Sequence, residues 1–325
     1  MRRVLKCEEE GQVGRVSFRK PRCRTTGEKL ENRRKSLRPN SAATRQIRNC
    51  AVCQTVTEQE LLYEKWGYPI FRCRVCHLGS TGLSGSFDAA SIYSRSYFHG
   101  ERKDGYADYP GSEDVLRKEF GRIVAKLRGY GLSSGRLLEI GSAYGFFLLE
   151  AQHYFECYGV EISEEAVKSC QARGLNVHCG TVNPEFLKEN GPFDVTVMLD
   201  VIEHLQNPAE ILTMLYAVLN QQGLLMLSTG DWDSILAKVM KKHWRLMTPP
   251  QHLFYFSRKT LIDLLRKTGF RVIYCARPWK SIPLGLAAYQ FGNRIGLRLA
   301  SLESLNWLAV PVNLFDTIQV IARKE

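Results

Sequence analysis

Four cysteines of this chain stand at a spacing that is typical of metal sites. Cys50 and Cys53 form one C-x-x-C pair, Cys73 and Cys76 form a second, and 19 residues separate the two pairs. Each pair can present two thiolates to one ion, and four soft ligands in tetrahedral geometry suit zinc. Because all four positions are filled by protein ligands, no position stays open for water. We therefore predict a small zinc ribbon whose metal is structural.

A glycine turn between two apolar runs is the second feature with chemical meaning. Residues 137–140 lead into Gly141 and Gly145, and residues 157–160 are closed by Glu161. The order strand, glycine turn, helix, strand is one half of a nucleotide-binding α/β fold. Gly141 would let a ligand approach the backbone, and Gly145 would let the helix pack closely on the strand. Glu161 could accept hydrogen bonds from both hydroxyls of a ribose.

The same turn lacks the features that a dinucleotide requires. A dinucleotide fold uses G-x-G-x-x-G to seat a pyrophosphate on the helix N-terminus. Ala143 and Phe146 occupy the second and third glycine positions here. We therefore expect a nucleoside ligand without phosphates.

The elements that must position these residues alternate between strand and helix. Such alternation predicts an α/β fold with a doubly wound, mostly parallel sheet. An amphipathic helix is expected over residues 115–127, before the first strand, and residues 315–324 are expected to form the last strand. Four further helices are expected to begin at side-chain caps, namely Ser163, Asn183, Asn207 and Ser257.

Charge and composition divide the chain into parts. Residues 1–49 hold 15 Lys and Arg against 5 Glu, so nearly all of the net charge of +12 lies there. We predict a basic, disordered tail over 1–48, the zinc ribbon over 49–80, a tyrosine-rich connector over 81–114 and a catalytic domain over 115–325. The ten cysteines, without an apolar leader, predict reduced thiols in a cytosol.

The motifs of the catalytic domain resemble those of class I S-adenosylmethionine (SAM) methyltransferases. E-x-G-x-x-x-G at residues 139–145 is similar to motif I of that family, D-V-I-E-H-L at 200–205 to its fourth-strand motif, and 223–228 to its fifth strand. The resemblance implies a seven-stranded Rossmann-like sheet of order 3-2-1-4-5-7-6 with an antiparallel last strand. It also implies SAM as methyl donor, with these contact residues: Glu139, Gly141, Ser142, Gly145, Glu161, Ile162 and Asp200.

Methyl transfer from a sulfonium is an in-line displacement, so the enzyme mainly aligns the reactants. An oxygen or carbon nucleophile also needs a base. His252 is the first candidate, because a neutral imidazole stands there on a proline-stiffened loop beyond the fifth strand. A loop histidine that caps backbone groups is the alternative. His204 and Tyr255 are the next candidates, and His204 is also suited to contact the cofactor region.

The whole layout resembles bacterial methyltransferases of glycan, cell-envelope and secondary-metabolite pathways. It implies a small-molecule or lipid-linked acceptor, such as a sugar or a cell-envelope glycan precursor. An insertion over 278–314 carries an apolar stripe at 282–310, which we interpret as a lid or a membrane-surface contact. A helix pair that only extends the core is the alternative. The enzyme is expected in the cytoplasm or at the inner face of the membrane.

Two other functions stay open at this point. A zinc ribbon before a SAM domain also resembles certain ribosomal-RNA guanine methyltransferases. The chain after residue 49 has a net charge of only about +2, which makes nucleic acid an unfavoured partner. A non-catalytic SAM-binding module is the second alternative.

Overall fold

The computed structural model describes residues 45–83, 109–283 and 309–325 of the 325-residue chain. The tail 1–44, the connector segment 84–108 and the insertion segment 284–308 lie outside the described residues. The predictions of a disordered tail, of a tyrosine-rich cover and of an apolar stripe fall on these segments and stay predictions. Asn40–Glu325 forms one compact unit.

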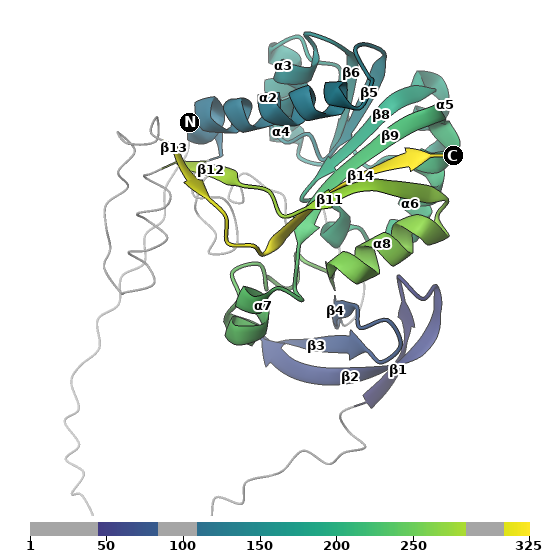
Figure 1. The fold of residues 1–325 in the computed structure, drawn as a ribbon, viewed down its shortest axis with the longest axis vertical. Coiled ribbons are helices and arrows are strands. Elements are labelled where there is room, and N and C mark those ends of the chain that lie inside the picture. Colours follow the sequence, from purple (N-terminus) through teal and green to yellow (C-terminus); the bar gives the residue numbers. More distant parts are fainter. Residues whose placement is uncertain (1–44, 84–108, 284–308) are drawn as a thin grey trace, which may run out of the picture. The chain divides into compact units, whose positions relative to one another are not determined.

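A seven-stranded sheet forms the centre of the larger domain (Figure 1). Its strands follow the order β11-β14-β9-β8-β5-β6-β7. Numbered along this domain and read from β7, the order is 3-2-1-4-5-7-6. The sheet is mixed. The strands β5 to β9 pair in parallel with one another, whereas β14 runs antiparallel to both β11 and β9. The strands are β5 (Arg136–Ile140), β6 (Glu156–Glu161), β7 (Val177–Cys179), β8 (Phe193–Leu199), β9 (Leu219–Gly230), β11 (Phe270–Ala276) and β14 (Thr317–Lys324).

Helices cover both faces of this sheet because its strands are apolar on both faces. Leu137, Val195 and Met226 point to the face that α2 (Glu113–Gly129), α3 (Phe146–Ala151) and α4 (Glu164–Ala172) cover. Their neighbours Leu138, Met198 and Leu225 belong to the opposite core. That core also holds side chains of α5 (Pro184–Asn190), α6 (Pro208–Val218) and α8 (Arg258–Lys267).

The expected helix caps are confirmed. Ser163 accepts a hydrogen bond from the Ala166 N–H, and Asn183, Asn207 and Ser257 each accept one from the residue three positions later. Each cap satisfies a backbone donor that the first helical turn leaves unpaired. These caps fix where α4, α5, α6 and α8 begin, and therefore how the loops at the carboxyl ends of the strands are directed.

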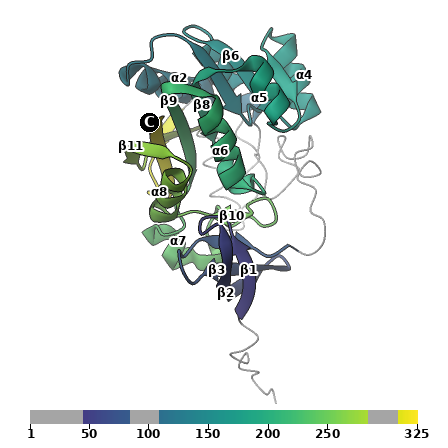
Figure 2. The same ribbon diagram turned by 90° about the vertical axis from the view of Figure 1, so that its right-hand side faces the viewer.

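The cysteine ribbon is a five-stranded antiparallel sheet of order β1-β2-β3-β4-β10. Four strands come from the N-terminal segment, namely β1 (Arg45–Cys50), β2 (Thr55–Lys65), β3 (Tyr68–Cys73) and β4 (Gly79–Thr81). Residues 45–48, expected in the tail, lie in the first described strand of the ribbon, because residues 45–50 pair with residues 55–60 of β2. The fifth strand, β10 (Phe254–Tyr255), belongs to the larger domain (Figure 2).

Short elements complete the described chain. The helix α7 (Ile235–Met240) and three 3₁₀ turns, η1 (Pro110–Ser112), η2 (Ile202–His204) and η3 (Lys241–His243), lie in the connections. The insertion starts with β12 (Lys280–Pro283) and ends with β13 (Ala309–Val312), which pair antiparallel. Within the described ranges, every helix is too short or too polar to cross a bilayer.

Candidate active site and cysteine cluster

The glycine turn after β5 has the backbone geometry that only glycine adopts without strain. Gly141 has φ +73° and Gly145 has φ +75°. A Cβ atom at Gly141 would lie 2.6 Å from Cγ2 of Val201. At Gly145 it would collide with the side chains of Leu175 and Cys170. The turn therefore lies directly against the segment that follows β8, and the two segments form one edge of the site.

Glu161 ends β6 with a buried carboxylate that holds this turn in place. Its Oε2 accepts a hydrogen bond of 2.8 Å from the Ala143 N–H, and its Oε1 accepts one of 2.8 Å from the Ser163 N–H. Burial raises the pKa of this carboxyl, and these backbone donors oppose the increase. A carboxylate offers about four lone-pair sites. Glu161 can therefore accept further hydrogen bonds from a ligand without losing those to the turn.

Two buried polar atoms beside the turn have no hydrogen-bond partner among the described residues. They are Oε2 of Glu139 and Oγ of Ser142, and both residues are 3% exposed. Burial raises the pKa of Glu139 well above its usual range, and the nearby charge of Glu161 raises it further. Buried polar groups are nearly always paired in folded proteins. Orphaned atoms at a glycine turn therefore mark a place for a polar ligand.

Asp200 and Ile162 complete the set of residues expected around a cofactor. Asp200 follows β8 with φ +56°, and the hydroxyl of Ser228 on β9 donates a hydrogen bond of 2.7 Å to its carboxylate. Its N–H also donates to the Ser228 carbonyl at 3.0 Å. Ile162 is partly buried directly after Glu161. The structure thus places all seven of these residues at the carboxyl ends of β5, β6 and β8, where ligands bind in this class of sheet.

The two candidate histidines lie against each other. The rings of His204 and His252 have centroids 4.7 Å apart and meet edge to face at 79°. Nδ1 of His204 lies 3.0 Å from the carbonyl oxygen of Gln251. Burial lowers the pKa of both histidines, and for His252 the neighbouring imidazole of His204 lowers it further. Both rings are therefore neutral near pH 7, as a proton acceptor or a metal ligand must be.

Tyr255, the third catalytic candidate, is buried in the sheet contact with the ribbon. Its hydroxyl lies 3.1 Å from Oγ1 of Thr81, whose own proton is directed at the His252 carbonyl at 2.6 Å. The tyrosine hydroxyl is therefore the donor to Thr81. Burial raises the pKa of Tyr255, so the side chain stays protonated at neutral pH. This geometry suits a group that holds the His252 loop better than one that exchanges protons.

Sequence reasoning gave no role to three residues that shape this site. Glu203 is buried beside the two histidines, Gln251 orients His204 through its carbonyl, and Thr81 binds the His252 loop from the ribbon. The adjacent pair Glu203 and His204 in D-V-I-E-H-L could have indicated a charged cluster. No local pattern indicates Thr81, because it meets His252 only through the pairing of β4 with β10.

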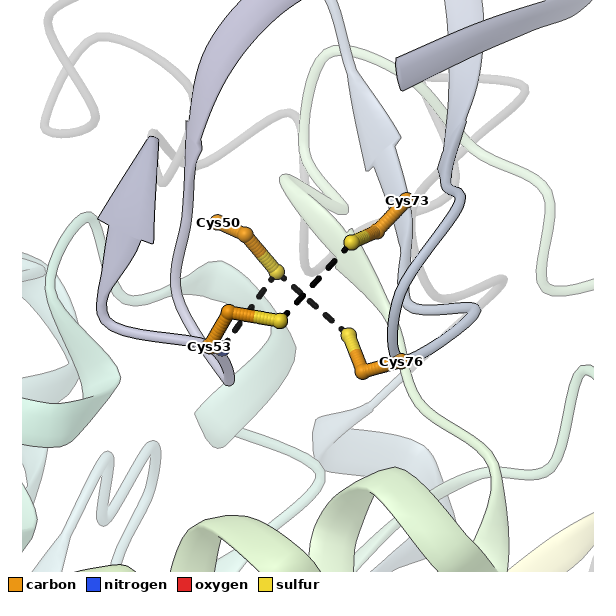
Figure 3. Close-up of side chains that lie close together, drawn as sticks. All are labelled: Cys50, Cys53, Cys73 and Cys76. Atoms are coloured by element: carbon orange, nitrogen blue, oxygen red, sulfur yellow. Dashed lines mark hydrogen bonds between the residues drawn. The ribbon is translucent and has the colours of Figure 1, made fainter. Parts of the chain in front are cut away.

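The four cysteines of the ribbon point toward one another from two turns (Figure 3). Their sulfur atoms all lie within 4.8 Å of one another, with Cys50 and Cys76 at 3.4 Å and Cys53 and Cys73 at 3.8 Å. Sulfur ligands at about 2.3 Å from a tetrahedral zinc ion would be about 3.8 Å apart. The backbone N–H groups of Val75 and Leu78 also point at the sulfurs of Cys73 and Cys76. This donor set fits a tetrahedral thiophilic ion.

One family model and several solved structures are similar to this chain. Residues 114–274 match the family described as "Methyltransferase domain". The chain is similar to a SAM-dependent methyltransferase from Thermotoga maritima, with 21% identity and a TM-score of 0.43 over 66% of this chain and 91% of that chain. No curated protein matches the sequence.

Two further solved structures are similar to this chain. One is magnesium protoporphyrin IX methyltransferase from Synechocystis with bound SAH, at 16% identity and a TM-score of 0.44 over 70% of this chain and 91% of that chain. The other is a SAM-dependent methyltransferase from Archaeoglobus fulgidus, at 21% identity and a TM-score of 0.45 over 64% and 94%.

The strand order, the glycine turn and the family match together define a class of protein, the SAM-dependent methyltransferases. This chain is an enzyme of that class.

Proposed function

We propose that the enzyme transfers the methyl group of SAM to a hydroxyl of a small-molecule or lipid-linked acceptor, with a sugar or a cell-envelope glycan precursor as the favoured class. The assignment of SAM as the cofactor rests on two buried polar atoms that have no hydrogen-bond partner among the described residues. They are Glu139 Oε2 and Ser142 Oγ, and they lie beside a turn whose glycines have left-handed backbone angles. The acceptor class is supported by the resemblance of the ribbon, the connector and the P-P-x-H-L-x-Y-F-S loop to glycan-pathway enzymes.

The cofactor is assigned to the carboxyl ends of β5, β6 and β8. Glu161 accepts the ribose hydroxyls with the lone pairs that Ala143 and Ser163 leave open. Gly141 and Gly145 give the turn its left-handed backbone beside the methionine part, to which Glu139 and Ser142 offer polar atoms. SAM supplies an electrophilic methyl group on a sulfonium. The protein must exclude water and hold the acceptor oxygen in line with the C–S bond.

The acceptor is assigned to the side of the site where the His252 loop lies. His204 and His252 are both neutral near pH 7, so either imidazole can take the proton of an acceptor hydroxyl. Tyr255 donates its proton to Thr81, and we assign it to holding the loop. The part of the chain after residue 49 has little net charge, which favours a small acceptor over RNA.

The cysteine cluster is assigned to structural zinc. Four thiolates leave no open coordination position, and the cluster belongs to the same buried core as the α8 side chains Leu261 and Leu264. Lys267 at the end of α8 also donates a hydrogen bond of 2.8 Å to the Val52 carbonyl in the first cysteine turn. The ion would therefore stabilise the surface on which α8 and the His252 loop rest.

One experiment tests cofactor and acceptor together. The purified chain is incubated with SAM and a panel of sugar nucleotides and lipid-linked sugars, and products are sought as a mass increase of one methyl group. Glu161→Ala should weaken SAM binding by about 10- to 150-fold in calorimetry, because hydrogen bonds to a charged acceptor contribute roughly 1.5–3 kcal/mol. Glu164→Ala, which removes an exposed carboxylate three residues later, is the control and should bind SAM normally.

Two results would contradict the proposal. An unchanged dissociation constant for Glu161→Ala would show that the ribose lies elsewhere. Methylation of RNA by the wild-type enzyme, with no product from the sugar panel, would replace the small acceptor by the ribosomal-RNA alternative. Tight SAM binding without any methylated product in either panel would favour the non-catalytic binding module.

A further inference from the structure

The helix α7 carries two large aliphatic side chains on its outer face. Ile235 is 83% exposed and Val239 is 75% exposed. The two residues are four positions apart, so their side chains lie on the same face of the helix, one turn from each other. Single exposed apolar residues are ordinary on protein surfaces, whereas exposed apolar residues that are grouped mark a contact with a partner.

The fold of α7 does not depend on these two side chains. The inner face of the helix packs into a small core, to which it contributes Leu236, Ala237 and Met240. At the start of the helix, the Ser234 hydroxyl accepts a hydrogen bond of 3.1 Å from the Ala237 N–H. The core contacts and the cap therefore hold α7 in place, and its outer aliphatic face is left to solvent.

A neighbouring segment exposes two more apolar side chains. Leu314 and Phe315 directly precede Asp316, and they are 43% and 57% exposed. The Asp316 carbonyl accepts a hydrogen bond of 2.8 Å from the Asp231 N–H, three residues before the cap of α7. The Asp316 carboxylate accepts one of 2.9 Å from Nε1 of Trp244, directly after η3. The residues before β14 therefore lie beside the α7–η3 segment, and both segments expose apolar groups.

Lysines accompany these apolar groups. Lys238 on α7 pairs with Asp233 at 2.9 Å. Lys241 and Lys242 are exposed directly after the helix, and neither forms a salt bridge within the part of the chain that the structure describes. Lys241 also has φ +50°, a conformation that glycine adopts without strain and lysine does not. The exposed charge of the segment is therefore positive, with three lysines against one aspartate.

This combination identifies the chemistry of the partner. Apolar side chains flanked by lysines match a bilayer with anionic headgroups, because the apolar groups enter the acyl boundary while the ammonium groups meet the phosphates. A small anion in water would make no use of the aliphatic side chains. An uncharged protein surface would make no use of the lysines.

The segment lies at the edge of the sheet where the methyl group is transferred. α7 follows the carboxyl end of β9, and the cofactor residues follow the carboxyl ends of β5, β6 and β8. Trp232, between β9 and α7, donates its N–H to the Phe256 carbonyl at 3.0 Å, and its ring stacks on that of Tyr255. α7 is therefore tied to β10, the strand that follows the His252 loop.

We propose that α7, η3 and the residues before β14 form a membrane-contact surface. Ile235, Val239 and Phe315 enter the acyl boundary of an anionic bilayer, and Lys241 and Lys242 bind its headgroup phosphates. This surface is separate from the stripe predicted at 282–310. Its role for the reaction rests on the proposed function: the contact brings the His252 loop to a lipid-linked acceptor, and that acceptor is favoured over a free sugar nucleotide.

Vesicle binding is measured first, without SAM or acceptor. The full-length protein is sedimented with vesicles of equal parts phosphatidylcholine and phosphatidylglycerol, or of phosphatidylcholine alone. We expect binding to the anionic vesicles that weakens with added salt. Binding to the neutral vesicles should be at least about 10-fold weaker, because each lysine near an anionic surface contributes about 5-fold.

A double variant tests the aliphatic face. Ile235→Ser/Val239→Ser should lower the affinity for anionic vesicles by at least about 10-fold, because two aliphatic side chains no longer leave water. Ile47→Ser is the matched control, since this isoleucine of β1 is 71% exposed outside the surface. The basic N-terminal tail is present in every variant, so its own attraction to the vesicles does not affect the comparison.

A single variant separates the charge of Lys241 from folding. Lys241→Gly removes the ammonium group and also relieves the positive φ, so the urea unfolding midpoint should not fall. Its affinity for anionic vesicles should nevertheless fall by about 5-fold. Lys168→Ala, at an exposed lysine of α4, is the control and should bind like the wild type.

Each outcome decides the inference. Equal vesicle affinity of the wild type and the double serine variant would overturn the surface and assign the contact to the basic tail. No vesicle binding by the wild type would overturn it as well, and a dimer that the double variant disrupts would assign the surface to a second copy. If the double variant loses vesicle binding but methylates a lipid-linked acceptor in vesicles at the full rate, the role at the acceptor is wrong. Vesicle binding together with no methylation of any acceptor would instead refute the proposed function.

Discussion

The hydroxyl of Thr81, in the last strand of the ribbon, donates a hydrogen bond of 2.6 Å to the main-chain carbonyl of His252 in the larger domain. The Thr81 N–H makes the neighbouring bond to Leu253 at 2.9 Å. Because β4 and β10 are paired at the same place, the ribbon fixes the loop that carries His252. The cysteine ribbon and the loop that carries His252 are thus joined directly by hydrogen bonds.

Replacing Thr81 tests this connection. Thr81→Val keeps the side-chain shape but leaves the His252 carbonyl and the Tyr255 hydroxyl without their partner. The unfolding free energy should fall by about 1–3 kcal/mol. Turnover should fall as well, while the dissociation constant for SAM stays the same. Thr81→Ser keeps the hydroxyl and should behave like the wild type in both urea unfolding and kcat. A wild-type-like Thr81→Val together with a destabilised Thr81→Ser would show that the methyl group, and not the hydrogen bond, matters.

Removal of zinc should lower turnover, because the ribbon holds the His252 loop through the pairing of β4 with β10. We expect about one zinc per chain in protein purified without chelator, and Cys73→Ser should abolish it. Because the His252 loop and not the glycine turn pairs with β4, turnover should fall more strongly than SAM affinity. Cys179→Ser, at an exposed cysteine outside the cluster, is the control. Metal analysis that finds no zinc in the wild type would contradict the assignment.

Alanine substitutions at two glycines distinguish the energetic cost of backbone strain from the cost of side-chain crowding at the glycine turn. Gly145 and Gly174 have φ of +75° and +76°, but only Gly145 has side chains where a Cβ atom would stand. Gly174→Ala should therefore cost about 1–2 kcal/mol for the left-handed conformation alone. Gly145→Ala should cost a further 1–3 kcal/mol or so from overpacking against Leu175 and Cys170, and it should weaken SAM binding. Similar unfolding midpoints for the two variants would show that the turn relaxes.

The buried carboxyl of Glu139 should make stability depend on pH in the absence of SAM. Burial raises its pKa in the folded state, so above its ordinary pKa the folded state binds more protons than the unfolded state. The unfolding free energy then decreases as the pH rises, by at most about 1.4 kcal/mol per pH unit. Glu139→Gln removes this titration. Relative to the wild type it should gain stability between pH 5 and pH 8 in urea unfolding, whereas the exposed Glu189→Gln should not.

The features that could be predicted from the sequence depend on residues that lie close together in the chain. A helix cap such as Ser163 and a turn such as Gly141 to Gly145 depend on only a few neighbouring residues. The residue types alone therefore predict them. The strand over residues 45–50 was missed because a strand is defined by its partner, here residues 55–60. The bond between Thr81 and Tyr255 joins residues 174 positions apart, and no spacing rule covers such a distance.

In the candidate site, too, local features could be predicted from the sequence, whereas contacts between distant residues could not. Glu161 was expected at the end of a strand, and it ends β6. Its contact with a ribose stays a prediction. His204 and His252 were treated as separate candidates for one base. Their contact depends on how the loop after Thr248 folds back over η2, and tertiary pairing decides that. The role of Tyr255 also depends on a partner in the ribbon, which its own sequence context does not contain.

The pairing of β4 with β10 also limits how this enzyme can be divided or recombined. The family match begins at residue 114, which makes the ribbon look like a detachable module. A chain cut at that point would lose the strand that Phe254 and Tyr255 pair with and would expose a strand edge beside His252, a candidate base. Gly79 in β4 also leaves space for the ring of Trp232, which a Cβ atom there would contact at 2.9 Å. An exchange of ribbons between related enzymes would therefore succeed only if the residues facing Gly79 and Thr81 were transferred with the ribbon.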